Sequence, residues 1–447
     1  MEFERMKNAL VAAADRAGLT EYEIYAQTEE SINAETLKDE ISSFSFGSEG
    51  GICFRCIADG KMGYASGELL TEDAMEDLVR AAISNAHCID TEDEVFIFEG
   101  SPSYAKIDLG EVALADAAVV RNTALDLQKA TYAADERVGD GTESAAFSFT
   151  TEVHLFNSHG LSLSNRTGIS GGYAAPVVRD GDDAQDHYEF GEGASFEDLV
   201  ELPEKAVRRA LDKLGAVTIP SGKYNVVFDG RQFRNFLSAF ASVFSAKNAQ
   251  KGLSLLAGKE GTEVAAPCVT LVDDPMRADS PLQTPFDGEG VATARRNVIE
   301  NGVLKTLLYD LTTAKKAGVE STGNGQKGSY AAPVAITPYH FGILPGTASD
   351  EELLASAGDG ILITECKGFH AGANAVTGDF SIESAGFRIR DGKRAEAIKS
   401  FTVAGNFFDL LKQITLIGNK TNWGISGGFP VYGSPSILVP NMSIAGE

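Results

Sequence analysis

The cysteines of this chain have the spacing most often associated with redox or metal chemistry. Cys53 and Cys56 form a CxxC pair within the segment GICFRCIADG. A redox or zinc site of this kind needs the pair at a helix start or beside a second pair of ligands. The segment instead predicts a strand, in which positions three apart point to opposite faces, and the sequence has no second CxxC. We therefore expect two ordinary thiols.

The six histidines are scattered along the chain. His154 and His159 flank a predicted turn at Asn157-Ser158, where strand geometry separates them and no third ligand lies nearby in sequence. A zinc site requires three or four ligands that converge on one point. This spacing argues against a metal site at the two histidines.

Several carboxylates could act as an acid/base pair or hold a cation. Asp273-Asp274 is one such group, and Asp287 with Glu289 is another. The Asp-Gly-Glu order around Gly288 is also favourable turn chemistry, and we prefer that interpretation. The glycine loop at residues 323–325 lacks both the length and the lysine of a phosphate-binding loop.

Asp287, Glu289 and the glycine loop all lie within one unit, from Phe286 to Gly325, which must position them. Asn301-Gly302 lies between two strand-like runs and predicts a hairpin, because both residues adopt positive φ readily. Asp310 can cap a helix from Leu311 to Ala317, and Gly318 would end it. The spacing predicts a hairpin, a short helix and a glycine-rich loop.

The first half of the chain shows the same order of elements twice. In each case a predicted helix precedes predicted antiparallel strands, and a second helix follows them. MEDLV at Met75 and FEDLV at Phe196 follow the two strand regions, so the order reflects either a duplication or a chance match. The predicted helices are Phe3–Ala17, Glu72–His87, Val112–Tyr132 and Ser195–Leu214.

A cluster of chain breakers at Thr218–Gly222 marks the strongest domain boundary. The sequence after it is rich in short strands, glycine and proline. We predict an α+β protein with an N-terminal helix-plus-antiparallel-sheet region, which a duplication could have produced, and a β-rich C-terminal domain. The expected division is residues 1–100, 101–220 and 221–447.

The balance of 38 basic and 64 acidic residues gives a net charge of −26. This charge argues against direct binding to nucleic acid or to an anionic membrane, since both need a cationic surface. The sequence shows neither a long apolar run nor the basic start of a signal peptide. Five cysteines in 447 residues do not make a disulfide framework. We expect a cytoplasmic protein.

The amino-acid sequence of the second half of the chain resembles the C-terminal domain of the TldD/PmbA family. TldD-like members of this family are metallopeptidase subunits, and PmbA members, also called TldE and associated with modulation of DNA gyrase, are their partners. The likeness covers five blocks, and the third is of the PmbA type. The blocks are Phe286–Gly325, Ser329–Gly346, His370–Phe387, Ser400–Leu416 and Thr421–Leu438.

One departure from the family pattern bears on function. TldD-like members carry HExxxH on a helix and a cysteine near the C-terminus, which together supply zinc ligands and a general base. The corresponding helix here, Arg231–Asn248, has no His, Glu, Asp or Cys, and Ser426 in WGISGG stands at the cysteine position. The chain therefore resembles the PmbA type, with no catalytic residue and no metal ligand of its own. Zinc is expected in a TldD-like partner.

The resemblance also suggests residues of a peptide path. It places the loop of His370, with Asn374 and Asp379, near the active-site cleft, although a solvated loop histidine is an equal alternative. The strand near Gly424 and Ser426 could pair with an extended peptide along its edge. The implied partners are a TldD-like subunit or a second copy, together with an unfolded peptide substrate. Phe407, Phe408, Leu410 and Leu411 are candidates for the docking surface.

Two other functions remain open at this point. The chain could be a self-sufficient metallopeptidase with atypical ligands drawn from His370, Asp379 or the His154 region. It could instead be a regulatory binding protein of the gyrase-modulator kind, although its charge argues against DNA itself as the partner.

Overall fold

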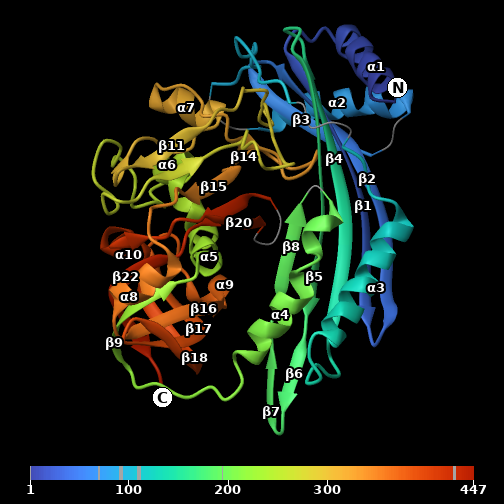
Figure 1. The fold of residues 1–447 in the computed structure, drawn as a ribbon. Coiled ribbons are helices and arrows are strands. Elements are labelled where there is room, and N and C mark those ends of the chain that lie inside the picture. Colours follow the sequence, from blue (N-terminus) through green and yellow to red (C-terminus); the bar gives the residue numbers. More distant parts are fainter. Residues whose placement is uncertain (1, 69–70, 90–93, 108–111, 194, 426–428) are drawn as a thin grey trace.

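The computed structural model describes residues 2–68, 71–89, 94–107, 112–193, 195–425 and 429–447. The N-terminal region is built around one long antiparallel sheet with the strand order β3-β2-β1-β4-β5-β8, and β6 and β7 form a separate hairpin (Figure 1). Its strands are β1 Tyr22–Leu37, β2 Glu40–Ala58, β3 Lys61–Gly67, β4 Glu143–Asn157, β5 Ser162–Ala175, β6 Val177–Asp180, β7 Asp183–Asp186 and β8 Glu189–Gly193.

This sheet contains two copies of the same arrangement. Strands β1–β3 form one meander and β4, β5 and β8 form the other, and the two meet where β1 pairs antiparallel with β4. Each meander lies between two helices in the chain, as the sequence predicted. The helices of the region are α1 Glu2–Arg16, α2 Glu72–Cys88, α3 Ala117–Ala133, the 3-10 helix η1 Phe196–Leu199 and α4 Leu202–Leu211.

The two faces of the sheet have different neighbours. Ile24 and Phe54 pack against α1 and α2. Tyr25, the next residue along β1, points the other way and packs against Phe286 of the C-terminal region. Successive strand residues point to opposite faces, so the helices cover one face and the C-terminal domain meets the other. Figure 1 shows α1, α2 and α3 on the side of the sheet away from that domain.

The C-terminal domain is built on two further six-stranded sheets. Their strand orders are β12-β11-β10-β15-β21-β20 and β18-β17-β16-β9-β22-β19. The strands are β9 Gly222–Phe228, β10 Leu271–Asp273, β11 Arg296–Glu300, β12 Val303–Leu304, β13 Gly325–Gln326, β14 Ala335–Ile336, β15 His340–Ile343, β16 Gly360–Lys367, β17 Asp379–Arg390, β18 Lys393–Asn406, β19 Leu416–Ile417, β20 Asn422–Ile425, β21 Val431–Ser434 and β22 Ile437–Ala445.

Helix α5 contributes its apolar side to the core that these two sheets share. The domain's other helices are short and lie around the sheets (Figure 1). The helices are α5 Gly230–Phe240, η2 Ala241–Phe244, α6 Ala246–Gln250, α7 Leu311–Ala317, α8 Asp350–Ala357, α9 Phe369–Gly372 and α10 Phe407–Gln413. The α+β class and the β-rich C-terminal half that the sequence predicted are therefore confirmed.

The predicted turn chemistry is confirmed where it was most specific. Asn301 and Gly302 have φ of 49° and 83° between β11 and β12. Asp310 accepts the N–H of Thr313 at 2.7 Å and caps α7, which ends at Gly318 with φ of 69°. Local residue choice is sufficient here because each of these motifs satisfies its own backbone groups.

Two predicted helices were wrong in extent, and most of the proposed docking surface is buried. The predicted helix Arg231–Asn248 is broken at Ser245, because Phe244 and Ala246 exchange backbone hydrogen bonds with Leu308 of a distant segment. The predicted helix Ser195–Leu214 is two helices, since Pro203 lacks an N–H and its ring would clash with the preceding turn. Phe407, Leu410 and Leu411, proposed as docking residues, are buried in the C-terminal core.

The described helices include none with both the length and the apolar character needed for a bilayer crossing.

Candidate functional site

Helix α5 is fixed by its apolar side. Phe233, Phe236 and Phe240 have no exposed surface, and Phe236 packs edge-to-face on Phe228, with 5.4 Å between the ring centroids. Asp229 caps the helix by accepting the N–H of Arg231 at 2.9 Å. The three phenylalanines recur at helical spacing, so one side of the helix is aromatic. The core therefore decides which side of the helix faces outward.

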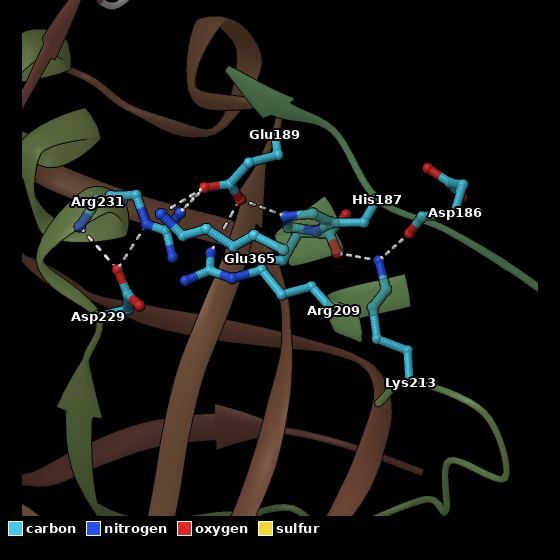
Figure 2. A network of polar contacts seen from close by, with 9 residues as sticks. Asp186, His187, Glu189, Arg209, Lys213, Asp229, Arg231 and Glu365 are labelled. Carbon is cyan, nitrogen blue, oxygen red and sulfur yellow. Dashed lines mark hydrogen bonds and ion pairs between the residues drawn. The ribbon is translucent and has the colours of Figure 1, made fainter. Parts of the chain in front are cut away.

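The outward side carries Arg231 and Arg234, spaced three residues apart. The Arg231 guanidinium donates to Glu189 of β8 at 2.5 Å and lies beside Asp229 at 3.4 Å (Figure 2). Glu189 has 4% of its side chain exposed and also accepts from Arg209 of α4 at 3.3 Å. A buried carboxylate needs such partners, since its ionised form is poorly solvated.

Further cations surround the same carboxylate. His187 and Lys205 lie 3.0 and 3.2 Å from Glu189. Burial alone would raise the pKa of Glu189, but the hydrogen bond from His187 and the charges of Arg209 and Lys205 hold it below its ordinary value. We call the cluster of Glu189, His187, Lys205, Arg209 and Arg231 the interdomain ion cluster.

A second contact beside this cluster joins the same two domains. Lys213, which follows α4, donates to the Asp186 carbonyl and to the Glu365 carboxylate of β16, both at 2.6 Å (Figure 2). Burial raises the pKa of Glu365, yet bonds from Lys213 and Lys367 bring it below its usual value. The N-terminal sheet is thus held to the C-terminal domain by charged contacts at this point.

Arg234 lies directly against the strand that carries Gly424. A Cβ atom added to Gly424 would sit 1.9 Å from Nη1 of Arg234, so any larger residue there would displace the guanidinium. Burial lowers the pKa of Arg234, and Glu192 of β8 opposes this shift. Glu192 Oε1 accepts the N–H of Ile425 at 2.9 Å. Two charged residues of opposite sign therefore flank strand β20.

Strand β20 is the last strand of its sheet, as expected for a strand that could add a peptide at its edge. Glu192 occupies the Ile425 N–H on that edge. Ser426, the other residue proposed here, lies outside the described residues.

A cavity of about 610 Å³ opens beside β20, between the N-terminal sheet and the C-terminal domain. Arg277 stacks on the Trp423 ring at 4.3 Å from its centroid, and both residues line the cavity together with Glu192. Among the described residues, neither Nη1 of Arg277 nor Oε2 of Glu192 has a hydrogen-bond partner. Both atoms are buried behind the cavity wall, so the structure leaves one donor and one acceptor unpaired beside the cavity.

The loop of His370 approaches α5 from another direction. Phe369 packs edge-to-face on Phe236 of α5 at 4.9 Å between centroids, and His370 beside it is exposed. Asn374 Oδ1 accepts the N–H of Val376 at 3.0 Å, and Asp379 accepts from Asn406 at 3.0 Å. Asn374 and Asp379 therefore stabilise the loop, which the structure places beside α5 but does not join to Gly424.

The remaining candidates for metal or redox chemistry separate in space. Cys56 packs beneath α1 and α2, whereas Cys53 faces the C-terminal domain, so the expectation of two independent thiols is confirmed. His154 bonds to Glu152 at 2.8 Å and His159 to Glu21 at 2.9 Å. Within the described ranges, no group of three His, Cys, Asp or Glu side chains could hold a metal ion.

Asp287 and Glu289 form a buried pair with structural partners. Asp287 Oδ1 accepts the N–H groups of Glu289 and Val291, both at 2.9 Å, which confirms the turn interpretation. Glu289 accepts the N–H of Leu311 at 2.8 Å at the edge of a cavity of about 860 Å³. Burial raises the pKa of both carboxyl groups, and for Glu289 the charge of Asp287 adds to this shift.

Because folding raises the pKa of Asp287 and Glu289, we expect the free energy of unfolding to fall as the pH rises. An acid whose pKa is raised by folding keeps its proton in the folded state after the unfolded chain has lost it, so stability declines through neutral pH. We expect Glu289→Gln to reduce the loss of unfolding free energy between pH 5 and pH 8.5 by more than about 1.4 kcal/mol. Urea unfolding at both pH values measures it, with Glu300→Gln on the half-exposed hairpin as control. An equal pH slope in native protein and Glu289→Gln would contradict the assignment.

Comparison with known proteins now adds to this geometry. The sequence profile of the PmbA/TldA metallopeptidase C-terminal domain matches residues 221–446. Profiles of domain 1 and of the central domain of the same family match residues 22–86 and 107–214.

The chain belongs to the PmbA/TldA metallopeptidase family. The Metalloprotease PmbA of Escherichia coli O157:H7 is 26% identical, over 99% of this chain and 96% of that protein. The structure of TldE from Thermococcus kodakarensis has 25% identity and a TM-score of 0.88, covering 99% of this chain and all of the other. A Thermotoga maritima structure, described as a candidate modulator of a DNA gyrase, has 30% identity and a TM-score of 0.89 with the same coverage.

The residues around α5 do not fit a zinc ion, the metal that the family resemblance implies. Zinc in proteins is bound by imidazole, thiolate or carboxylate groups. The outward side of α5 presents two guanidinium groups, which are donors with no lone pair to offer. Of the carboxylates near these arginines, Glu189 and Asp229 are occupied by arginine or by the helix N-terminus, and Glu192 accepts the N–H of Ile425. No catalytic step through zinc follows from the described residues around α5.

Sequence reasoning missed the residues that form this site. Arg231, Arg234, Glu189, Glu192 and Arg277 were not singled out. One signal was present, because two arginines three apart on a helix with an aromatic stripe must share the side opposite the core. Their acidic partners come from β8, which is remote in sequence.

Proposed function

We propose that this PmbA/TldA-family chain is the non-catalytic, PmbA/TldE-type subunit of a two-component metallopeptidase. In this proposal a TldD-like partner holds the zinc ion and activates water. The observation that carries it is that α5 has no His, Cys, Asp or Glu side chain and presents Arg231 and Arg234, each facing a carboxylate of β8.

The contribution of this chain is part of the peptide path. The cavity beside β20 lies between the domains, and Arg277 and Glu192 line it as a donor for a peptide carbonyl and an acceptor for a peptide N–H. Trp423 lines the same cavity and holds the Arg277 guanidinium on its ring. We place the assembly in the cytoplasm with unfolded or modified peptides as substrates.

Reconstitution with a TldD-like chain tests the proposal. Unfolded polypeptide should be cleaved by the mixture, and Arg277→Ala in this chain should lower kcat/KM of the mixture roughly tenfold, the effect of losing about 1.4 kcal/mol of substrate interaction. Arg390→Ala is the matched control, because Arg390 forms an exposed ion pair with Glu396 on β18. A mixture whose activity is unaffected by both variants would exclude this cavity from the peptide path.

A second candidate is a regulatory binding protein, and the description of the Thermotoga maritima relative favours it. Purification from cell extract separates the two proposals. Recovery of gyrase subunits in place of a TldD-like chain would support the regulatory function and contradict the peptidase complex.

A further inference from the structure

Strand β2 leaves one edge of the N-terminal sheet open. β2 spans Glu40–Ala58, but β3 pairs only with residues 52–58 of it. Residues 40–51 therefore have β1 on one side and, among the described strands, no neighbour on the other. An open edge presents unpaired N–H and C=O groups that another strand can bind.

A β-bulge at Ser42 interrupts one end of the open segment, but the residues after it lack the charges and proline that usually protect an edge. Residues 41–48, ISSFSFGS, contain no charge and no proline in a chain of net charge −26. Phe44 and Phe46 are 48% and 61% exposed. They pair with Ala34 and Ile32, which are buried beside α3, so the two phenylalanines extend an apolar face beyond the helix that covers it.

The order of residues indicates what fits this edge. Ser42–Ser48 reads S-S-F-S-F-G-S, which is nearly the same in both directions around Ser45. Antiparallel pairing with an identical strand, centred on Ser45, would place Phe44 opposite Phe46 of the other copy and Ser43 opposite Gly47. The bulge at Ser42 ends this regular segment, and Glu40 and Glu49 lie outside it, so no like charges would be directly opposed within it.

We infer that this edge is the contact between two copies of the chain, joined antiparallel through residues 43–47 of β2. The pairing makes one continuous sheet from the two N-terminal sheets, with four phenylalanines clustered on its helix-covered face. The contact is isologous, since each copy offers the same segment about a twofold axis. It does not depend on a TldD-like partner.

Cysteine cross-linking of the full chain tests the register. In a Cys88→Ser, Cys268→Ser background, which removes the two exposed thiols, Ser45→Cys should form a disulfide-linked dimer or be joined by a short bismaleimide. Ser48→Cys is the matched control. The two Ser48 positions would lie six residues apart along the paired strands, about 20 Å, beyond the roughly 7 Å that a disulfide can bridge. Equal disulfide formation at both positions, or none at position 45 with either reagent, overturns the proposed register.

Light scattering over a hundredfold concentration range tests the contact itself. The native chain should reach twice the 47.3 kDa monomer mass, and Phe46→Lys should raise the dissociation constant at least tenfold. Val200→Lys, at a position 79% exposed outside the sheet, should leave association unchanged. Thermal unfolding verifies that both variants are folded. A Phe46→Lys protein that dimerises like Val200→Lys, or a native chain that associates only with a TldD-like chain, contradicts a self-contact.

Discussion

Purified by itself, this chain is expected to contain no stoichiometric zinc and to cleave no unfolded peptide. A catalytic zinc needs about three ligands from His, Cys, Asp or Glu and one open position. Helix α5 offers arginines in their place, and these are already committed to contacts with β8 and β20. The loss of activity relative to a complete complex should therefore be total within the limit of the assay.

Elemental analysis and a peptide-cleavage assay of the lone chain measure this, and both are repeated after a TldD-like chain is added. Ser426→Cys serves as an internal control. It restores one thiolate at the position where the family resemblance places a zinc ligand, yet activity should stay absent because the imidazole pair and the base are still missing. Chelator-sensitive cleavage by the lone chain would establish a self-sufficient metallopeptidase instead.

The second large effect is expected at the interdomain ion cluster. Glu189→Ala should lower the free energy of unfolding by about 3 kcal/mol, because removing one partner of a buried ion pair leaves the others uncompensated. The carboxylate has 4% of its surface exposed and contacts Arg231, Arg209, Lys205 and His187. Urea unfolding at neutral pH measures the change.

A variant at an exposed glutamate distinguishes the effect of burial on stability from the effect of losing a charge. Glu204 of α4 pairs with Arg208 while 75% of its side chain is exposed, so Glu204→Ala should cost less than about 1 kcal/mol. The pH dependence is a further check. The pKa of Glu189 is lowered by its partners, so its contribution is complete above the unfolded pKa and is lost as the pH falls through the folded value. Equal costs for the two variants, or a cost for Glu189→Ala that persists in acid, would contradict the assignment.

Sequence by itself determined the features that are encoded locally. The Asn301-Gly302 hairpin, the Asp310 cap and the aromatic side of α5 follow from neighbouring residues, and each satisfies its own backbone groups or repeats at helical spacing. The absence of zinc ligands from residues 231–248 is likewise a property of residue types. The α+β class followed from the change between long helical patterns and short strands.

Only the tertiary structure decided the ends of helices and the composition of the site. Ser245 breaks a helical pattern because Leu308, more than sixty residues away, binds the backbone on both sides of it. Arg231 meets Glu189, and Arg277 meets Trp423, because separate strands and helices converge between the two domains. Such contacts depend on how whole sheets pack. A sequence pattern gives the spacing of residues within one helix or strand. It does not give the distance between elements that are remote in sequence and meet only in the packed core.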